Sequence, residues 1–330
     1  YNFTNHLVAL EDKFAGKKID LNKSELTLHK IRTSNTILCN GHIERFISFR
    51  NNDLPGVMLA SSFEKYIHRY GVVPEERPVI FTNNSSSMSL LNSMLSLGCK
   101  PEAYVDSRKK EEIETDIKKI LKENNIPSYF DAEIEGCDGN KKIEKITIRQ
   151  GKIFIKIKSS MLCVSGGYNP DIHLFTQSKC LVKWDKNISS FKPDTPFQKT
   201  LTLGSVSGNY NFNKLCEEIN EKLSFLNTAK LDFEIKLNVS NKYSIKELWE
   251  TKSKINSNWS KSFIDLHNDV TIKDLKQAIS EGFDRIEHLK RYTTNSMGTD
   301  QGKISSINSL AIVSKLLKKE ISEVGTTTYR

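Results

Sequence analysis

The 330-residue sequence lacks several patterns that would assign a function directly. No apolar run reaches the roughly 18 residues that a membrane-spanning helix needs, so no membrane association is predicted. No basic motif is interleaved with aromatic residues, and 49 Lys and Arg are mixed with 40 Asp and Glu along the chain, so nucleic-acid binding is not expected. No two cysteines form a CxxC pair, which indicates reduced, buried thiols in a cytoplasmic protein. The six cysteines are Cys39, Cys99, Cys137, Cys163, Cys180 and Cys216.

Glycine is missing from the loop where a dinucleotide-binding fold needs it most. Apolar residues 78–81 and 103–106 predict two parallel strands, and residues 87–97 between them predict a helix that ends at Gly98. The distance from this loop to Asp106 suits a phosphate loop and a ribose-binding carboxylate, but residues 82–87 read Thr-Asn-Asn-Ser-Ser-Ser. Side chains at these positions keep a pyrophosphate away from the backbone. We therefore predict a second nucleotide-type domain that is empty, with Asp106 closing the sheet edge rather than binding ribose.

Residues 263–304 carry the most consistent local signals in the chain. Thr271 suits an N-cap, an apolar series at helical spacing follows it, and Gly282 suits the left-handed position after the helix. A second short helix, with Ile286 and Leu289 facing inward, ends in a basic and hydroxyl-rich cluster. That cluster is a candidate seat for an anion such as a phosphate. Its members are Lys290, Arg291, Tyr292, Thr293 and Thr294.

The order of elements in residues 263–304 resembles the small helical domain that holds a two-iron two-sulfur cluster in bacterioferritin-associated ferredoxins and several flavoenzymes. The four cysteine positions of that domain fall here on Asp265, His267, Asp300 and Ser305. An iron–sulfur cluster is held by thiolates, and none of the four residues supplies one. The resemblance therefore implies a domain that is retained without its iron–sulfur cluster and without another metal.

Five motifs resemble the family of bacterial heterotetrameric sarcosine oxidase α subunits. They are GHIER at residues 41–45, DLPGVMLA at 53–60, SGGYNP at 165–170, HLKRYTT at 288–294 and DQGK at 300–303. The resemblance implies a partial two-dinucleotide-domain flavoprotein fold of the glutathione-reductase type, of class α/β, followed by the cluster-free ferredoxin-like domain. It also implies an oxidoreductase complex that demethylates sarcosine to glycine, reduces O2 to H2O2 and passes the one-carbon unit to tetrahydrofolate.

The resemblance also implies which residues meet cofactors. Five residues that follow short apolar strands are expected to form the far wall of an NAD pocket, where the backbone approaches the ribose or the pyrophosphate. They are Asn40, Gly41, Gly166, Gly204 and Ser205. Ser205 stands where FAD-binding relatives have an acid. The phosphate of an FMN shared with the β subunit is expected to contact Lys290, Arg291, Thr293 and Thr294. FAD belongs to the β subunit, so no catalytic residue for amine oxidation is expected in this chain.

The same reading divides the chain into five parts. Residues 1–72 and 151–225 form the first, NAD-type dinucleotide domain, and residues 73–150 form the second, degenerate one. Residues 226–260 are a connector containing a predicted strand at 231–237, and residues 261–330 are the ferredoxin-like domain with a linker. Because the chain begins at Tyr1 and stops at Arg330 without natural ends, we expect a piece of a longer polypeptide that continues into a folate-binding domain.

The expected partners are the β, γ and δ subunits, and folate through the missing domain. Two alternatives stay open. One is the α subunit of a related amine or imino-acid dehydrogenase acting on proline, an opine or glycine. The other is a non-catalytic scaffold.

Overall fold

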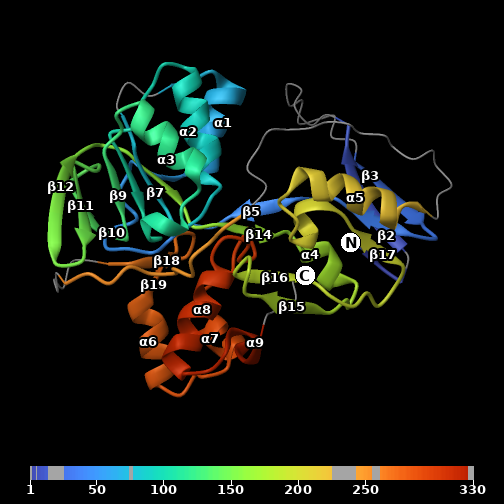
Figure 1. Ribbon diagram of the computed structural model, residues 1–330. Coiled ribbons are helices and arrows are strands. Elements are labelled where there is room, and N and C mark those ends of the chain that lie inside the picture. Colours follow the sequence, from blue (N-terminus) through green and yellow to red (C-terminus); the bar gives the residue numbers. More distant parts are fainter. Residues whose placement is uncertain are drawn as a thin grey trace.

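A computed structural model describes residues 2–4, 6–13, 26–73, 77–224, 243–254 and 261–325. Figure 1 shows a body around a parallel sheet, a second body of short strands with one long helix, and a C-terminal group of helices beneath them. The α/β class predicted from the sequence is confirmed. Residues 226–242 and 255–260, with the predicted strand at 231–237, lie outside the described residues.

The first body is built on a five-stranded sheet in which every neighbouring pair is parallel, in the order β6-β13-β7-β8-β9. Its strands are β6 (Val57–Leu59), β7 (Val79–Thr82), β8 (Ala103–Asp106), β9 (Ser128–Phe130) and β13 (Leu162–Ser165). Its helices are α1 (Ala60–Tyr70), α2 (Ser87–Ser96) and α3 (Thr115–Glu123). Strands β7, β8 and β13 are buried over their whole length, which explains their continuous apolar runs. The predicted strand–helix–strand unit at 78–106 is confirmed.

An antiparallel sheet continues this body. Strands β10 (Ala132–Asp138), β11 (Lys145–Gln150) and β12 (Ile153–Lys158) pair in chain order, and the chain then returns to β13 between β6 and β7. The strand order therefore reverses at β7, where β8 lies on one side and β13 on the other. In open parallel sheets such a reversal is where nucleotides bind, outside the carboxyl ends of the strands.

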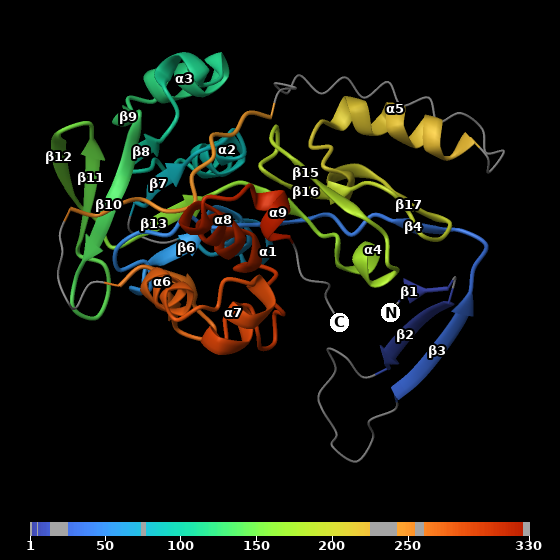
Figure 2. The ribbon, with the colours of Figure 1, turned by 90° about the horizontal axis from the view of Figure 1, so that it is seen from below.

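The second body holds shorter sheets. Strands β4 (Thr36–Leu38) and β17 (Thr200–Thr202) are parallel neighbours. Around them lie β15 (Val182–Asp185) with β16 (Ser190–Pro193), α4 (His173–Gln177), α5 (Phe212–Lys222) and the short helix η2 (Gly204–Ser207). Strands β1 (Asn2–Phe3), β2 (His6–Asp12) and β3 (Leu26–Arg32) form a separate antiparallel sheet. The views in Figures 1 and 2 place α5 and the β15–β16 hairpin beside the β4–β17 pair.

Two extended segments connect the bodies. Strand β5 (His42–Glu44) pairs antiparallel with β14 (Tyr168–Pro170), and this crossover ribbon runs between the two bodies in Figure 1. Arg45 lies in it, almost fully buried, and donates to the Gly166 carbonyl (2.7 Å), the Asn169 side chain (2.7 Å) and the Ser189 carbonyl (2.8 Å). Its guanidinium also lies 4.6 Å from the centre of a Trp249 ring.

The C-terminal module, residues 261–325, is a short hairpin and four helices. The hairpin pairs β18 (Phe263–Asp265) with β19 (Val270–Thr271), and the helices are α6 (Ile272–Ser280), α7 (Ile286–Thr293), α8 (Ser306–Leu317) and α9 (Ile321–Val324). Thr271 caps α6 as predicted, since its hydroxyl accepts from the Asp274 amide and the Asp274 carboxylate accepts from the Thr271 amide. Gly282 takes the left-handed conformation. Leu289 is fully buried, as expected for the inner face of α7.

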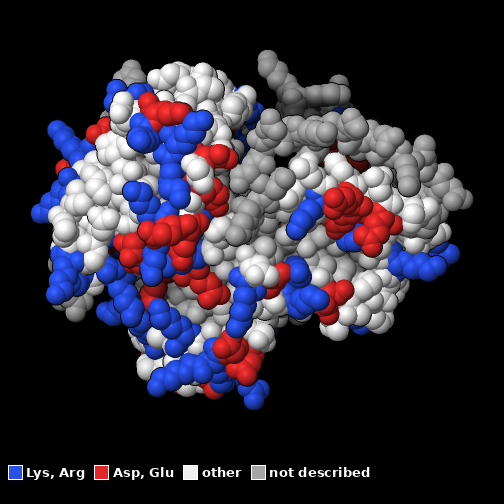
Figure 3. All heavy atoms as spheres, in the orientation of Figure 1, with Lys and Arg blue, Asp and Glu red and all other residues white. Residues whose placement is uncertain are grey.

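Two features of the sequence, its mixed charges and its six cysteines, have counterparts in the structure. Figure 3 shows Lys and Arg interspersed with Asp and Glu over the face in view, rather than gathered in one basic patch. All six cysteines are free thiols, but only Cys137, Cys163 and Cys180 are buried, so the prediction of burial was wrong for Cys39, which is exposed. None of the described helices has the length and hydrophobicity needed to cross a bilayer.

Candidate cofactor-binding site

The carboxyl ends of β4 and β17 bring four of the five predicted NAD-wall residues together. These strands run in parallel with Thr202 opposite Leu38, so Asn40 and Gly41 leave the sheet beside Gly204 and Ser205. Gly41 (φ 86°) and Gly204 (φ 77°) both adopt left-handed backbone conformations that favour glycine. A Cβ added to Gly41 would lie 4.0 Å from the Ser205 Oγ. Two glycine turns thus meet at one sheet end, the arrangement that lets a phosphate-bearing ligand approach backbone.

Two acidic residues that the sequence analysis did not select fix these turns, Glu218 through its carboxylate and Asp171 through its backbone. Glu218 on α5 accepts from the Gly204 amide (3.2 Å), and its other oxygen pairs with Lys222 (2.6 Å). Burial alone would raise the pKa of Glu218, but the bonds from Lys222 and Asn209 hold it below its usual range. Asp171 holds the other turn, since its amide donates to the Gly41 carbonyl (3.0 Å) and its carbonyl accepts from the Asn40 side chain. Glu218 follows no recognisable motif, and although Asp171 comes directly after the SGGYNP motif, its contacts with the turn are visible only in the fold.

Gly166 lies apart from the other four. Its amide donates to the Arg45 carbonyl (2.9 Å). Arg45 is four residues beyond Gly41, so an extended chain places it up to about 13 Å from Gly41. A Cβ at Gly166 would stand 2.7 Å from the Phe46 carbonyl oxygen. The close approach of two backbone segments in the crossover ribbon therefore explains this glycine without a cofactor.

The carboxyl ends of β7, β8 and β13 are covered by the chain itself. Residues 243–246, which we call the strap, run across the loop after β7 and form a bridge between Asn84 and Ile245. The Ser85 amide donates to the Ser244 carbonyl (3.0 Å), and the Lys246 amide donates to the Asn83 carbonyl (2.9 Å). Lys246 also reaches the Ser107 carbonyl after β8, at 2.6 Å. The Ser85 amide, a donor that a pyrophosphate could use, is therefore already bonded within the protein.

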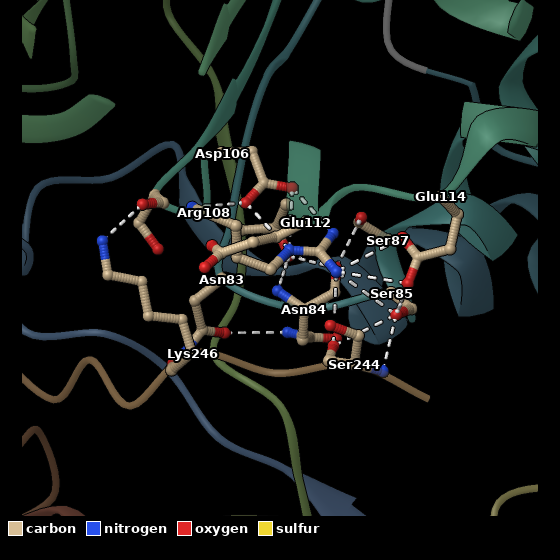
Figure 4. Close-up of polar contacts among 12 residues, drawn as sticks. Asn83, Asn84, Ser85, Ser87, Asp106, Arg108, Glu112, Glu114, Ser244 and Lys246 are labelled. Atoms are coloured by element: carbon tan, nitrogen blue, oxygen red, sulfur yellow. Dashed lines mark hydrogen bonds and ion pairs between the residues drawn. The ribbon is translucent and has the colours of Figure 1, made fainter. Parts of the chain in front are cut away.

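A buried ionic network lies under the strap. Figure 4 shows Arg108 between Asp106 and Glu114, with Ser85 and Ser244 at its side. Its Nη2 is 2.8 Å from Asp106 Oδ2, and its Nη1 is 3.2 Å from Glu114 Oε2. Burial alone would lower the pKa of Arg108, but the adjoining Asp106 carboxylate raises it above its usual range, so the guanidinium stays charged. Asp106 thus bonds within the protein, as predicted, and is not directed at a ribose.

The four positions that align with the cluster-binding cysteines of the ferredoxin-like domain form polar turns. Asp265, only 2% exposed, accepts from the His267 and Asn268 amides through Oδ1, and from the Asn268 side chain and the Ser296 amide (2.7 Å) through Oδ2. The Ser296 hydroxyl lies 3.0 Å from the Ser305 hydroxyl. This donor set does not fit a cluster held by four thiolates, because it contains no sulfur and the Asp265 oxygens are already hydrogen-bonded.

Asp300, the remaining position, accepts from the Gly302 amide (2.9 Å) within its own turn. Over the described ranges, no group of three or more His, Cys, Asp or Glu side chains is placed to hold a metal ion.

The four residues predicted to hold the FMN phosphate gather at the carboxyl end of α7. Arg291 is exposed and pairs with Glu287 at 3.4 Å, and the Thr293 hydroxyl donates to the Leu289 carbonyl (2.8 Å). Thr294 follows the helix with φ 63°, and its hydroxyl donates to the Thr293 carbonyl (2.6 Å). Lys290 is half-buried. Because the carboxyl end of a helix carries partial negative charge, the helix itself does not attract a phosphate here. An anion would have to be held by Lys290 and Arg291 alone.

Known proteins resemble the chain over most of its length. Residues 259–330 match the family description "Sarcosine oxidase A3 domain". The chain is 30% identical over 314 residues to the sarcosine oxidase subunit alpha of Rhizobium meliloti (strain 1021), covering 92% of this chain and 30% of that protein. It is 27% identical over 326 residues to the sarcosine oxidase subunit alpha of Corynebacterium sp. (strain P-1), covering 91% of this chain and 32% of the relative. The chain belongs to the sarcosine oxidase α-subunit family.

The fold has a counterpart among solved structures. L-proline dehydrogenase from P. horikoshii superposes with a TM-score of 0.65 over 100% of this chain and 60% of that chain, at 18% identity. This likeness concerns the fold alone and supports the expected two-dinucleotide-domain architecture. The chain spans about a third of the length of the sarcosine oxidase α subunits it matches.

Proposed function

We propose that this chain is part of the α subunit of a heterotetrameric sarcosine oxidase. The complex would oxidise the N-methyl group of sarcosine, reduce O2 to H2O2 and transfer the one-carbon unit to tetrahydrofolate. The observation that carries the proposal is the match to sarcosine oxidase α subunits over nine-tenths of the chain. The name "subunit alpha" of these relatives supports a complex with further subunits, which we propose to be β, γ and δ.

The role of this chain in the complex is to hold cofactors rather than to oxidise the amine. Asn40, Gly41, Gly204 and Ser205 fit the far wall of an NAD pocket, because two left-handed glycines meet at one sheet end. Bound NAD would supply a hydride acceptor at this wall. Amine oxidation is assigned to an FAD on the β subunit.

Lys290 and Arg291 are proposed to hold the phosphate of an FMN shared with the β subunit. Thr293 fits this role less well than the sequence suggested, because its hydroxyl donates within α7. FMN would carry electrons from the amine-oxidising flavin toward O2. The two cations would neutralise its phosphate and anchor one end of the cofactor at the surface of the C-terminal module.

The domain division is part of the proposal. Residues 1–72 and 151–225 would form the NAD-type domain, residues 73–150 a degenerate second nucleotide domain, and residues 261–330 a ferredoxin-like module without its cluster. The strap and the Arg108 network support an empty second site, since they use the groups a second nucleotide would contact.

An α subunit of a proline dehydrogenase is the second candidate. It is favoured by the fold likeness to L-proline dehydrogenase and disfavoured by the lower identity, 18% against 30% for the sarcosine oxidase relative.

The deciding experiment is to purify the full-length protein with its natural partners and measure peroxide release. Sarcosine should be oxidised faster than proline or dimethylglycine. Oxidation of proline without peroxide release would favour the dehydrogenase. No oxidation of any amine by a complex that retains its flavins would favour a scaffold.

A further inference from the structure

The C-terminal module docks on the crossover ribbon through an apolar contact with a polar rim. Ile307 and Leu310 of α8 share a buried cluster with Ile172 and Phe191. The Asn308 side chain donates to the Phe46 carbonyl (2.8 Å) in the interior of this contact. A void of only about 10 Å³ lies between Ile307 and Lys303 of the module and Ile43 and Phe191, so the two surfaces are closely packed there.

Lys303 lies at the edge of this contact, on a turn whose shape is fixed. The Asp300 carboxylate accepts from the Gly302 amide (2.9 Å), and Gly302 has φ 74°. A Cβ on Gly302 would stand 2.2 Å from the Ser306 Oγ and 2.5 Å from the Ser296 Cβ, so only glycine fits. The following residue, Lys303, places its Nζ 3.6 Å from the Asp171 Oδ2.

Asp171 therefore contacts both the module and the candidate dinucleotide turn. Its carboxylate meets Lys303 of the module and the His173 ring, while its backbone amide and carbonyl bond to Gly41 and Asn40. Burial alone would raise the pKa of Asp171, but His173 and Lys303 hold it below its usual range, so the carboxylate stays ionised near neutral pH. A shift of the Asp171 backbone would move the Gly41 carbonyl directly.

From these contacts we infer that Asp171 and Lys303 are positioning residues that couple docking of the C-terminal module to the shape of the NAD-binding turn at Asn40 and Gly41. The inference rests on the proposed NAD site. Neither residue touches the dinucleotide. Lys303 holds Asp171, and Asp171 holds the turn that forms the pocket wall.

The test is an NAD titration of the complete complex after NAD has been removed, comparing wild type with three variants. Lys303→Gln removes one partly exposed ion pair worth up to about 1 kcal/mol, so the Kd for NAD should rise about three- to fivefold. Lys303→Arg should stay within about twofold of wild type. Lys315→Gln is the matched control, because it breaks another ion pair of the same module, to Glu250 at 3.8 Å, and should leave the Kd unchanged. FMN content should not change in any of them, and the midpoint of thermal unfolding should fall by no more than a few degrees, to a similar extent in Lys303→Gln and Lys315→Gln.

Asp171→Asn adds a second, independent measurement. It keeps the backbone groups that bond to Gly41 but loses the charge that holds Lys303, so it should weaken NAD binding at least as much as Lys303→Gln. Adding Lys303→Gln to Asp171→Asn should then change nothing further, since both act through one contact. Additive effects, or wild-type affinity in Lys303→Gln, would overturn the coupling while leaving the NAD site in place. A wild-type complex that binds no NAD would overturn both the site and the coupling.

Discussion

The Arg108 guanidinium lies 2.8 Å from the Asp106 carboxylate, with both side chains at most 1% exposed, at the sheet edge where a dinucleotide would bind. Glu114 and the strap complete the surroundings of this pair. This charge network links β8 and the loop after β7 to the strap, the segment that leads to the C-terminal module.

Replacing Arg108 should destabilise the chain strongly. Arg108→Ala leaves the Asp106 carboxylate buried without its cation, and removing one partner of a buried pair costs about 3–5 kcal/mol. Urea unfolding measures the change. Lys119→Ala is the control, because Lys119 makes an exposed pair with Glu123 at 3.9 Å and its loss should change stability by about 0.5 kcal/mol or less. Equal effects of the two substitutions would show that the Arg108 network does not stabilise the fold.

The turn before Lys303 should accept no side chain at Gly302. Gly282→Ala meets no atom within 4 Å and should cost only the roughly 1–2 kcal/mol of a left-handed non-glycine residue. Gly302→Ala adds a clash with Ser306 and Ser296, which should raise the loss by about 1–3 kcal/mol. Thermal unfolding of both variants gives the comparison. A Gly302 variant as stable as the Gly282 variant would mean that the turn is not closely packed.

Stability should depend on pH through Glu44 in the crossover ribbon. Burial raises the pKa of Glu44 to about 7, although the Ser61 amide donates to it at 2.7 Å. Because the folded state binds this proton more tightly than the unfolded state, the contribution is fully present below about pH 4.5 and is lost as pH rises through 7. The loss amounts to about 3 kcal/mol at most.

Glu44→Gln should remove this part of the pH dependence and should be more stable than wild type at pH 8. Unfolding free energies at pH 5 and pH 8 test it. Parallel pH profiles of variant and wild type would contradict the assignment.

Much of the fold could be predicted from local patterns, because continuous apolar runs mark buried parallel strands and Thr271 with Gly282 bounds a helix. The meeting of Gly41 with Ser205 rests on a resemblance that spans distant segments. The roles of Glu218, Asp171 and the strap were missed, since each depends on contacts with backbone groups of other segments.

The weakest sequence inference concerned the cluster on α7. Its charges suggested an anion seat, yet the hydroxyl of Thr293 is used by the helix, and the carboxyl end of a helix opposes an anion. Which side chains are already bonded depends on the fold and cannot be read from composition.

Lys290 and Arg291 should nevertheless control flavin retention if FMN lies beside α7. Lys290→Ala with Arg291→Ala removes both cations, and each charge-assisted bond to a phosphate contributes about 1.5–3 kcal/mol. The assembled complex should then lose most of its FMN while keeping its FAD, as measured by flavin extraction. Lys318→Ala with Lys319→Ala is the control, since these residues lie on the same module after α8. Unchanged FMN content in the α7 variant would remove these residues from the site.

The account depends most on the polar turns of the C-terminal module, where Asp265 and Ser305, two of the four positions proposed to correspond to thiolate ligands, hydrogen-bond with Ser296. Iron, acid-labile sulfide, flavin and NAD should be quantified together in the complex purified with its partners. We predict flavin and NAD without stoichiometric iron or sulfide. Two irons and two sulfides assigned to this chain would contradict the account.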